Sequence, residues 1–322
     1  MGAPPAARGV VTGPLVTIGI PTFNRADGYL REALADALAQ DYPNLEIVVS
    51  DNASTDGTPE LVRGAADPRL RYLRHERNIG GNANFNACLA AARGEFFLLL
   101  HDDDRLDPDF VSSCMRAVED AGSSTPVGLI RTGTRVIDER GVVVSERRNQ
   151  ASSVTAADLM ESWFDRRTSM YFASTLFRTE ALREIGGFVT PQGLYIDVVA
   201  AIRIAAQYRV IDVSDVKASF RRHGGNSGGL TSIAAWCEDS HHVVDVLCAV
   251  APDRALELRA RGLRYFTTNN YSRVRRLPGF WQRWQAYGHV YRSFGRSVSP
   301  LRFVVRRWLQ RGRAALLGQD PN

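Results

Sequence analysis

Apolar segments of strand length alternate with segments of helical periodicity through the first hundred residues, and this alternation limits the fold more than any other feature. Buried-strand patterns occur at 15–20, 45–50 and 95–100, and helical patterns occur at 28–40 and 82–93. A chain that alternates in this way builds a parallel sheet with helices on both faces. We therefore predict an α/β fold with a mostly parallel sheet.

The chain changes character at a glycine-rich stretch. Four of the six residues at 224–229 are glycines, which cannot hold a helix, and the sequence beyond them is helical. The helical segments lie near 231–250, 253–270, 280–293 and 300–316. We predict three parts, namely a flexible N-terminus at 1–14, an α/β domain at 15–225 and a helical, arginine-rich C-terminal region at 226–322.

Charge is divided unequally along the chain. The formal net charge is +5, but residues 261–322 hold thirteen arginines and one acid and so carry +12, which leaves −7 on the rest. No nucleic-acid reader motif accompanies the arginines, so we expect no nucleic-acid partner. Near the C-terminus Arg302 and Arg306 lie opposite an apolar helical face, a pattern typical of helices on anionic membranes. Docking on a second copy of the chain, as a homodimer, or on its own acidic body are the alternatives.

Two features favour a cytoplasmic setting. The four cysteines are widely spaced without a CxxC pair, and the first fourteen residues lack the apolar core of a signal peptide. No run of eighteen apolar residues is long enough to span a membrane. We expect a cytoplasmic protein, peripheral at the inner face of the membrane if the C-terminal helices bind lipid.

Four polar loops follow predicted strands, and they begin at Pro21, Asp51, Asn78 and His101. Ligands bind at the carboxyl ends of parallel strands, so these loops should line one crevice. None has the glycine pattern of a P-loop or of a dinucleotide-binding turn. Amide, hydroxyl and carboxylate groups gather there instead, a set that suits a base, a ribose and a divalent metal ion.

The strongest signal is the acidic triplet Asp102-Asp103-Asp104 after the apolar strand. Adjacent carboxylates repel one another, and a bound cation such as Mg²⁺ or Mn²⁺ relieves that repulsion while it also holds a diphosphate. Because alternate side chains diverge in an extended chain, we expect Asp103 to point away from Asp102 and Asp104. A solvated acidic turn that caps the next helix is the alternative.

Several motifs in a fixed order resemble those of a known enzyme family. They are Ile20-Pro21-Thr22-Phe23-Asn24-Arg25, Val48 to Thr58, Asn78-Ile79-Gly80 with Asn86, Ala92-Arg93-Gly94-Glu95, the aspartate triplet and Gly186-Gly187-Phe188. From about residue 17 to about residue 225, the chain is similar to family 2 inverting glycosyltransferases. The resemblance implies a GT-A domain at 15–225, with a Rossmann-like, mostly parallel sheet, and a nucleotide-diphospho-sugar donor.

The resemblance also implies roles for residues of the four loops. The nucleotide contacts would be Pro21, Thr22, Asn24, Arg25, Asp51, Asn52, Asn78 and Asp102. Among them, Asp51 would accept a hydrogen bond from the imide N–H of uracil or thymine, and Asp102 would lie near the ribose. The metal ligands would be Asp103, Asp104 and His223, with contact to the diphosphate as the alternative for His223. His101 replaces the first aspartate of the family motif, which weakens the ribose assignment more than the metal assignment.

Asp197 is the predicted catalytic base. The family places an aspartate at the start of a helix some ten residues after Gly-Gly-Phe, and Asp197 occupies this place, with Arg203 six residues further on. Inversion needs one base that takes the proton of the acceptor hydroxyl. The usual preceding acid is Ile196 here, and this apolar neighbour would raise the pKa of the carboxylate toward useful values. Helix capping is the alternative role for Asp197.

Together these features predict a metal-dependent inverting glycosyltransferase. It would move a sugar from a UDP or dTDP type of donor to an acceptor hydroxyl, on a glycan, a lipid-linked molecule or a small molecule, by single displacement. Two alternatives stay open. A sugar nucleotidyltransferase would normally have a glycine-rich, basic loop after the first strand, and a non-catalytic nucleotide-sugar-binding partner subunit is suggested by His101 and Ile196.

Overall fold

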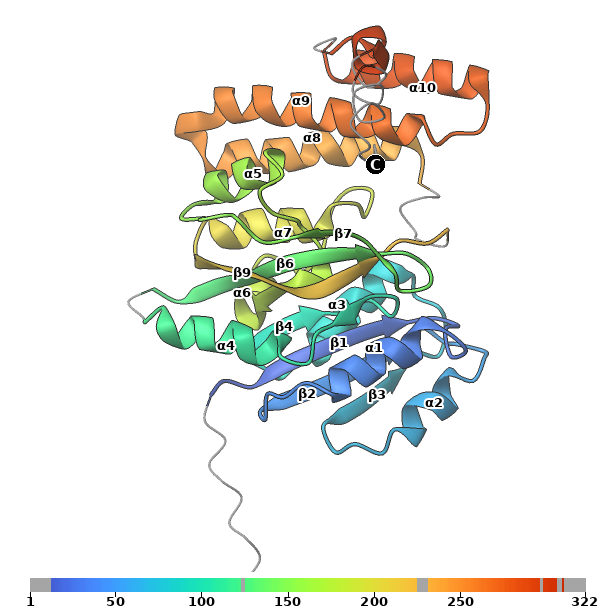
Figure 1. Cartoon of the computed structure of the whole chain (residues 1–322), viewed down its shortest axis with the longest axis vertical. Helices are drawn as coiled ribbons and strands as arrows, with labels where there is room; N and C mark the ends of the chain where they lie inside the picture. Colours follow the sequence, from blue (N-terminus) through green and yellow to red (C-terminus); the bar gives the residue numbers. More distant parts are fainter. Residues whose placement is uncertain (1–12, 123–124, 225–230, 296–297, 306–308, 310–322) are drawn as a thin grey trace, which may run out of the picture. The chain divides into compact units, whose positions relative to one another are not determined.

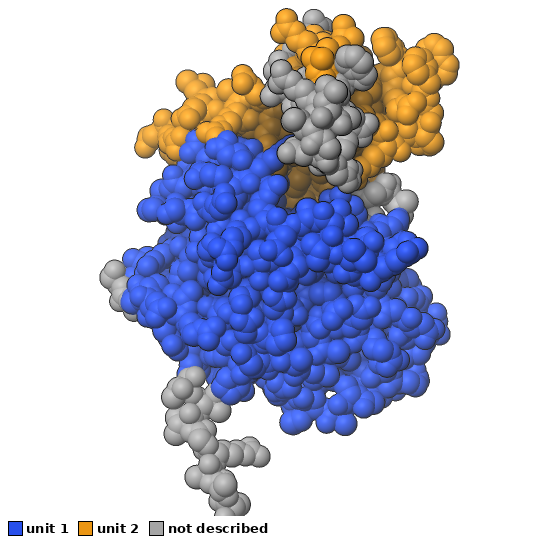
Figure 2. Space-filling model, in the orientation of Figure 1, with its two compact units in different colours: residues 1–189, 196–224 blue, residues 190–195, 225–322 orange. Residues whose placement is uncertain are grey.

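The computed structural model describes residues 13–122, 125–224, 231–295, 298–305 and 309. The chain forms two compact units, Met1–Val189 with Ile196–Gly224 and Thr190–Tyr195 with Gly225–Asn322 (Figures 1 and 2). Three predicted features lie wholly or partly outside the described residues. They are the N-terminus up to residue 12, the glycine-rich stretch at 225–229 and most of the last predicted helix beyond residue 305.

The first unit is built on one nine-stranded sheet whose first four strands are parallel. They run in the order β3-β2-β1-β4 and are β1 (Val16–Thr22), β2 (Leu45–Asp51), β3 (Leu70–Arg74) and β4 (Phe96–Leu99). Every residue of β1, β2 and β4 is buried, because helices cover both faces of a parallel sheet. The predicted α/β class is confirmed.

The sheet continues beyond β4 with mixed pairing. The further strands, in sheet order, are β8 (Thr175–Arg178), β6 (Val127–Ile137), β9 (Arg209–Arg221) and β5 (Arg105–Leu106), and β7 (Val143–Arg147) pairs with β6. Strand β8 is antiparallel to both β4 and β6, whereas β6 and β9 are parallel. The short strands β5 and β8 have no sequence signal of their own, because two to four residues show no periodicity.

Alternate residues of β1 face opposite sides of the sheet, and each side is covered by helices. Ile18 and Ile20 face the core shared with α1 (Tyr29–Leu38) and α4 (Phe110–Asp120). On the other face, a Cβ added at Gly19 would lie 2.8 Å from Cβ of Cys88 in α3 (Gly81–Ala91). Helix α3 therefore packs against β1 only because residue 19 has no side chain.

The remaining helices of this unit are α2 (Thr58–Gly64), α5 (Ala156–Phe164), α6 (Thr179–Glu184), α7 (Ile196–Ala205) and the short 3₁₀ helix η1 (Phe172–Ser174). Helix α5 begins with a capping box between Thr155 and Asp158. Helix α7 is buried at nearly every position, and it follows directly on the segment that belongs to the second unit.

The second unit is helical in its described residues. It contains α8 (Ile233–Val250), the 3₁₀ helix η3 (Pro252–Arg254), α9 (Ala255–Val274) and α10 (Phe280–Ser293). Helices α8 and α9 lie side by side (Figure 1), with apolar residues such as Val244, Leu247 and Phe266 fully buried. Within the described residues, no helix has the length and apolar character that crossing a membrane requires.

Candidate active site

The predicted loops meet at the carboxyl edge of the parallel strands. Thr22 and Asp51 end neighbouring strands in register. The hydroxyl of Thr22 donates a hydrogen bond of 2.7 Å to Oδ2 of Asp102, which follows β4. Nδ2 of Asn52 donates to Oδ1 of Asn78 at 2.9 Å. Side-chain hydrogen bonds thus join loops that lie far apart in the sequence.

Several predicted nucleotide contacts also hold the shape of their own loops. Asn24 has a positive φ of 53°, and its Oδ1 accepts a hydrogen bond of 2.8 Å from the backbone N–H of Thr55. Asp51 is fully buried, and its carboxylate accepts from the N–H of Ser54 at 2.8 Å and from the hydroxyl of Tyr72. These bonds fix the backbone of the loop edge where a ligand would bind.

Two other predicted nucleotide contacts, Pro21 and Arg25, lie at the same edge. Pro21 is in register with Ser50 near the end of β1, and it is buried. The guanidinium carbon of Arg25 lies 6.0 Å from the ring centre of Tyr29, at the start of α1. The positive charge of Arg25 also acts on Asp102, where it lowers the pKa of the carboxyl and so opposes the effect of burial.

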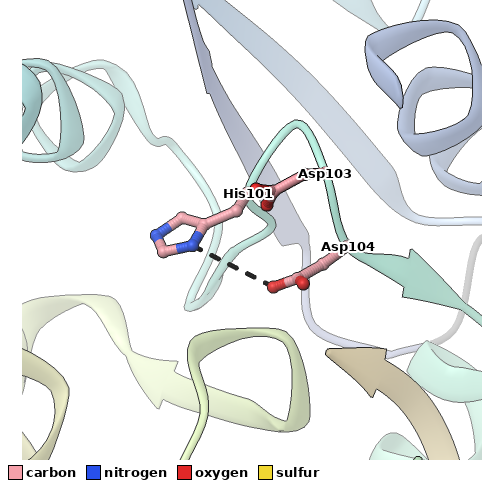
Figure 3. A group of neighbouring side chains, drawn as sticks. All are labelled: His101, Asp103 and Asp104. Atoms are coloured by element: carbon pink, nitrogen blue, oxygen red, sulfur yellow. Dashed lines mark ion pairs between the residues drawn. The ribbon is translucent and has the colours of Figure 1, made fainter. Parts of the chain in front are cut away.

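The acidic loop after β4 brings His101, Asp103 and Asp104 together. One potential ligand atom from each lies within 4.8 Å of the others, and Figure 3 shows the imidazole turned toward Asp104. The expectation that Asp103 points away from Asp104 is therefore wrong. The backbone N–H of Asp104 donates to the carbonyl of His101 at 3.1 Å, so these residues form a turn and the alternation of an extended chain does not apply.

The carboxylates of this loop are held away from water. Burial raises the pKa of Asp102 to about 7, and the charge of Asp103 contributes to this increase. Burial and the charge of Asp103 also raise the pKa of Asp104 well above its usual value. Each shift measures a free-energy cost of holding negative charge there, and a bound cation would lower that cost.

Buried Arg221 ties the acidic loop to β9. Its backbone N–H donates to Oδ1 of Asp104 at 2.9 Å, and its Nε donates to the carbonyl of Asp103 at 2.8 Å. Its Nη2 forms an ion pair of 2.7 Å with Glu32. Arg221 is 1% exposed, so it supports the loop from within, while the next residue, Arg222, is exposed.

His101 was not among the predicted metal ligands, although the structure places it in the cluster. Its ring packs against Phe85 and Phe172, with centroids 5.0 and 5.1 Å away, and burial lowers its pKa. Its buried Nε2 has no hydrogen-bond partner among the described residues, and its Nδ1 lies 4.0 Å from Oδ2 of Asp104. A neutral imidazole beside two carboxylates suits a divalent metal ion. The sequence signal that could have indicated His101 as a ligand is its position directly after an apolar strand and before the acidic triplet.

His223 reaches the same cluster from the end of β9. Its Nε2 lies 2.7 Å from Oδ2 of Asp103, and its ring lies 5.0 Å from that of Tyr29. The three predicted metal ligands, Asp103, Asp104 and His223, are therefore brought together.

Asp197, the predicted base, is the second residue of α7. Burial raises its pKa to about 6, and its Oδ1 accepts a hydrogen bond of 2.9 Å from the N–H of Val198. Tyr171 is a further buried titratable group of this unit. Burial raises its pKa, and the negative charges of Asp104 and Asp197 contribute to the increase. The ring of Tyr171 is stacked on Phe220 at 4.4 Å.

Two of the separate sequence motifs contact each other. The side-chain amide of Asn86 in α3 makes two hydrogen bonds to the backbone of Phe188. Its Nδ2 donates to the carbonyl of Phe188 at 3.1 Å, and its Oδ1 accepts from the backbone N–H of Phe188 at 2.9 Å. Gly187 has a φ of +78°, and a Cβ there would lie 2.4 Å from Oδ1 of Asn86. The glycine motif therefore allows Asn86 to hold one end of the segment that leads to Asp197.

Comparison with known proteins identifies the family of the chain. The model of the family "Glycosyl transferase family 2" matches residues 17–186, more than half of the chain. The chain therefore belongs to glycosyl transferase family 2.

Two curated relatives match over shorter stretches. The succinoglycan biosynthesis protein ExoO of Rhizobium meliloti (strain 1021) is 38% identical over 124 residues, which cover 38% of this chain and 34% of that protein. A GalNAc(5)-diNAcBac-PP-undecaprenol beta-1,3-glucosyltransferase of Campylobacter jejuni is 38% identical over 106 residues, which cover 32% of this chain and 34% of that protein. The chain thus matches about a third of the length of each relative.

A solved structure resembles nearly the whole chain. The crystal structure of S. aureus TarS 1–349 in complex with UDP-GlcNAc has a TM-score of 0.58 and covers 87% of this chain and 91% of its own. At 17% identity, this likeness shows a shared fold and confirms the predicted GT-A architecture.

Proposed function

We propose that this chain is a metal-dependent, inverting glycosyltransferase that moves a sugar from a nucleoside diphosphate, of UDP or dTDP type, onto an acceptor hydroxyl. One observation carries the proposal. One potential ligand atom from each of His101, Asp103 and Asp104 lies within 4.8 Å of the others in the loop after β4, and the same unit holds Asp197, a carboxylate whose pKa burial raises to about 6. A base beside a metal and diphosphate site is the arrangement that single displacement needs.

The chemical step is a direct substitution at the anomeric carbon. Ionised Asp197 would accept the proton of the acceptor hydroxyl as its oxygen bonds to that carbon, and the bond from the carbon to the diphosphate oxygen would break. Attack opposite the leaving group inverts the configuration. The pKa of Asp197, raised to about 6, leaves it ionised at neutral pH and basic enough to assist the transfer.

The residues of the acidic loop fit a divalent metal ion such as Mg²⁺ or Mn²⁺. The buried, unpartnered Nε2 of His101 and the close carboxylates of Asp103 and Asp104 supply hard and borderline donors, with His223 beside Asp103. A bound ion would neutralise the charge that develops on the leaving diphosphate. Asp51, Asn52 and Asn78 are proposed to hold the base and ribose, with Thr22 and Asp102.

Two variants test this assignment. Asp103→Ala should abolish Mn²⁺-dependent UDP binding, measured by titration calorimetry. Asp197→Asn should keep UDP binding but lose turnover by at least about a hundredfold, because it removes the base and leaves the donor site intact. Full transfer activity in Asp197→Asn would exclude it as the base. Pyrophosphate release from a nucleoside triphosphate would favour a nucleotidyltransferase instead, and tight binding without turnover on any acceptor would favour a partner subunit.

We further propose that the C-terminal helices contact an anionic lipid surface and that the acceptor is lipid-linked. Phe280, Trp281 and Trp284 of α10 are 64–73% exposed. No acidic residue occurs between Leu258 and Leu317, whereas fourteen arginines do. Exposed aromatic rings within a basic segment suit the boundary of an anionic membrane. The undecaprenol-linked acceptor in the name of the Campylobacter relative supports this proposal. The cytoplasmic setting stays a prediction.

A further inference from the structure

The chain crosses from one unit to the other immediately before the proposed base. Residues Thr190–Tyr195 belong to the helical unit, whereas Val189 before them and Ile196 after them belong to the α/β unit. We call this six-residue segment the crossing loop. It lies between Phe188, which Asn86 binds, and Asp197 at the start of α7. Its conformation therefore sets where α7 begins.

A single buried carboxylate in α8 organises the crossing loop. Asp239 is fully buried, and its Oδ1 accepts a hydrogen bond of 3.0 Å from the backbone N–H of Gln192. Its Oδ2 accepts from the N–H of Leu194 at 2.7 Å and lies 2.8 Å from the hydroxyl of Thr190. Three donors from one short segment thus converge on one side chain, and charge-assisted hydrogen bonds of this kind are strong.

The last residue of the crossing loop is also fixed by the helical unit. Tyr195 has a φ of +52°, which is rare for an aromatic residue and persists only where surroundings enforce it. Its ring packs against Trp236 of α8 and Phe266 of α9, with centroids 5.0 and 5.2 Å away. The guanidinium carbon of Arg273 lies 3.7 Å from the ring centre of Trp236 and 5.6 Å from that of Tyr195, so it contacts both rings.

We propose that Asp239 is a positioning residue for the transfer reaction. It holds the crossing loop in the one conformation that places the start of α7, and with it Asp197, in register with the donor site. Only Ile196 separates Tyr195 from Asp197, so a change in the loop reaches the base with little room for compensation. This proposal rests on the function proposed for Asp197.

The role of the helical unit follows from this arrangement. Asp239 touches neither donor nor acceptor in the proposed reaction, yet proton transfer depends steeply on geometry. A displacement of about 1 Å at the base can cost roughly a hundredfold in rate. On this proposal the helices after residue 231 contribute to the turnover number, whereas the residues proposed to bind the donor belong to the α/β unit.

The test compares two isosteric substitutions on the same helix in the full-length protein. Asp239→Asn replaces one acceptor oxygen by an amide that faces a backbone N–H. Asp245→Asn is the matched control, because Asp245 lies on the same helix, is exposed and forms an ion pair of 2.9 Å with Arg259. Hydrogen exchange of the peptide that contains residues 190–195 reports the loop directly, and steady-state kinetics and UDP titration report its consequence.

We expect Asp239→Asn to speed exchange in the crossing loop by about tenfold or more. We also expect it to lower kcat by about 10- to 100-fold with KM for the donor and Kd for UDP within about twofold. Asp245→Asn should match the unchanged protein in all of these. Loss of UDP binding in step with kcat would indicate general destabilisation and would overturn the proposal, as would faster exchange with unchanged kcat.

A milder variant guards against a protein that does not fold. Thr190→Val keeps the shape of the side chain and removes only the hydroxyl, so it should give the same pattern with smaller amplitude. An unchanged kcat in Thr190→Val despite faster loop exchange would also overturn the proposal. If the unsubstituted protein transfers no sugar, the function proposed for Asp197 fails, whereas the exchange experiment still decides whether Asp239 holds the loop.

Discussion

At the scale of single residues, the site depends on acidic groups that the fold keeps from water. Asp102, Asp104 and Asp197 all have raised pKa values, and burial is the largest cause in each case. Arg221 is buried beside Asp104 but already pairs with Glu32. Such a cluster destabilises the protein in the absence of a cation, and this cost is typical of functional sites.

The pKa of Asp197 predicts the pH dependence of turnover. The base acts only when it is ionised, and a pKa raised to about 6 means that it takes up a proton as the pH falls through 6. We expect kcat to fall about tenfold per pH unit below that value and to be level between about pH 7 and pH 8. Rates at saturating Mn²⁺ and substrates measure this. Constant kcat down to about pH 4.5 would contradict the assignment.

His101 allows a test of the metal site that preserves packing. In His101→Phe, a ring of similar size still packs against Phe85 and Phe172, but both nitrogens are lost. We expect the affinity for Mn²⁺ in the presence of UDP to fall by roughly tenfold, with little change in thermal stability. Calorimetric titration measures this, with Asp120→Asn at the exposed end of α4 as a control. Unchanged affinity would exclude His101 as a ligand.

At the scale of elements, the site is assembled where strands and helices end. Thr22 ends β1, Asp51 ends β2, the acidic loop follows β4 and His223 follows β9. Regular backbone hydrogen bonds hold the elements, so the loops between them are free to present polar groups. Close approaches between elements then require small residues, as Gly19 under α3 and Gly187 beside Asn86 show.

The two adjacent glycines of the motif give a matched pair of substitutions. Gly186 and Gly187 have φ values of +86° and +78°, so an added Cβ is strained at both. Nothing lies within 4 Å of a Cβ at Gly186, whereas one at Gly187 would lie 2.4 Å from Oδ1 of Asn86. We expect Gly186→Ala to lower the free energy of unfolding by about 1 kcal/mol and Gly187→Ala by about 2–4 kcal/mol. Urea unfolding measures both, and equal losses would show that the contact with Asn86 carries no stability.

At the scale of the whole molecule, charge is separated along the chain. Residues 261–322 carry +12 and the rest carries −7, so a single net charge of +5 describes neither part. The acidic part contains the proposed metal ligands. The basic part contains the exposed aromatic residues of α10. The same chain therefore offers a cation site and a surface suited to anions.

Lipid binding is the prediction at this scale. The full-length protein should float with vesicles that contain about a third phosphatidylglycerol, less so at high salt, and not with phosphatidylcholine alone. Trp281→Gln with Trp284→Gln should weaken flotation, whereas Val142→Gln with Val143→Gln, at exposed positions of the α/β unit, should not. Equal binding to vesicles of phosphatidylcholine alone would contradict the prediction that the arginines attract the protein to anionic lipid. A dimer that the tryptophan changes dissociate would favour a second copy as partner.

Much of the fold follows from periodicity in the sequence. The strands β1, β2 and β4 and the helices α1 and α3 lie within a few residues of their predicted bounds, since long apolar runs and helical spacing are strong local signals. Strands β5 and β8 were missed because they are held by pairing with distant strands and have no local pattern. The extended geometry expected for the acidic triplet failed for a similar reason, because a turn replaces the strand there.

The sequence by itself determined the α/β class, the four polar loops and the family, because strand and helix patterns and motif order are local properties of the chain. Only the tertiary structure decided which side chains meet. It placed His101 against two phenylalanines and beside Asp104, brought His223 to Asp103, and joined the crossing loop to Asp239 forty-five residues beyond Leu194. Burial and contact depend on how elements pack across the chain, and no short stretch of sequence encodes that packing.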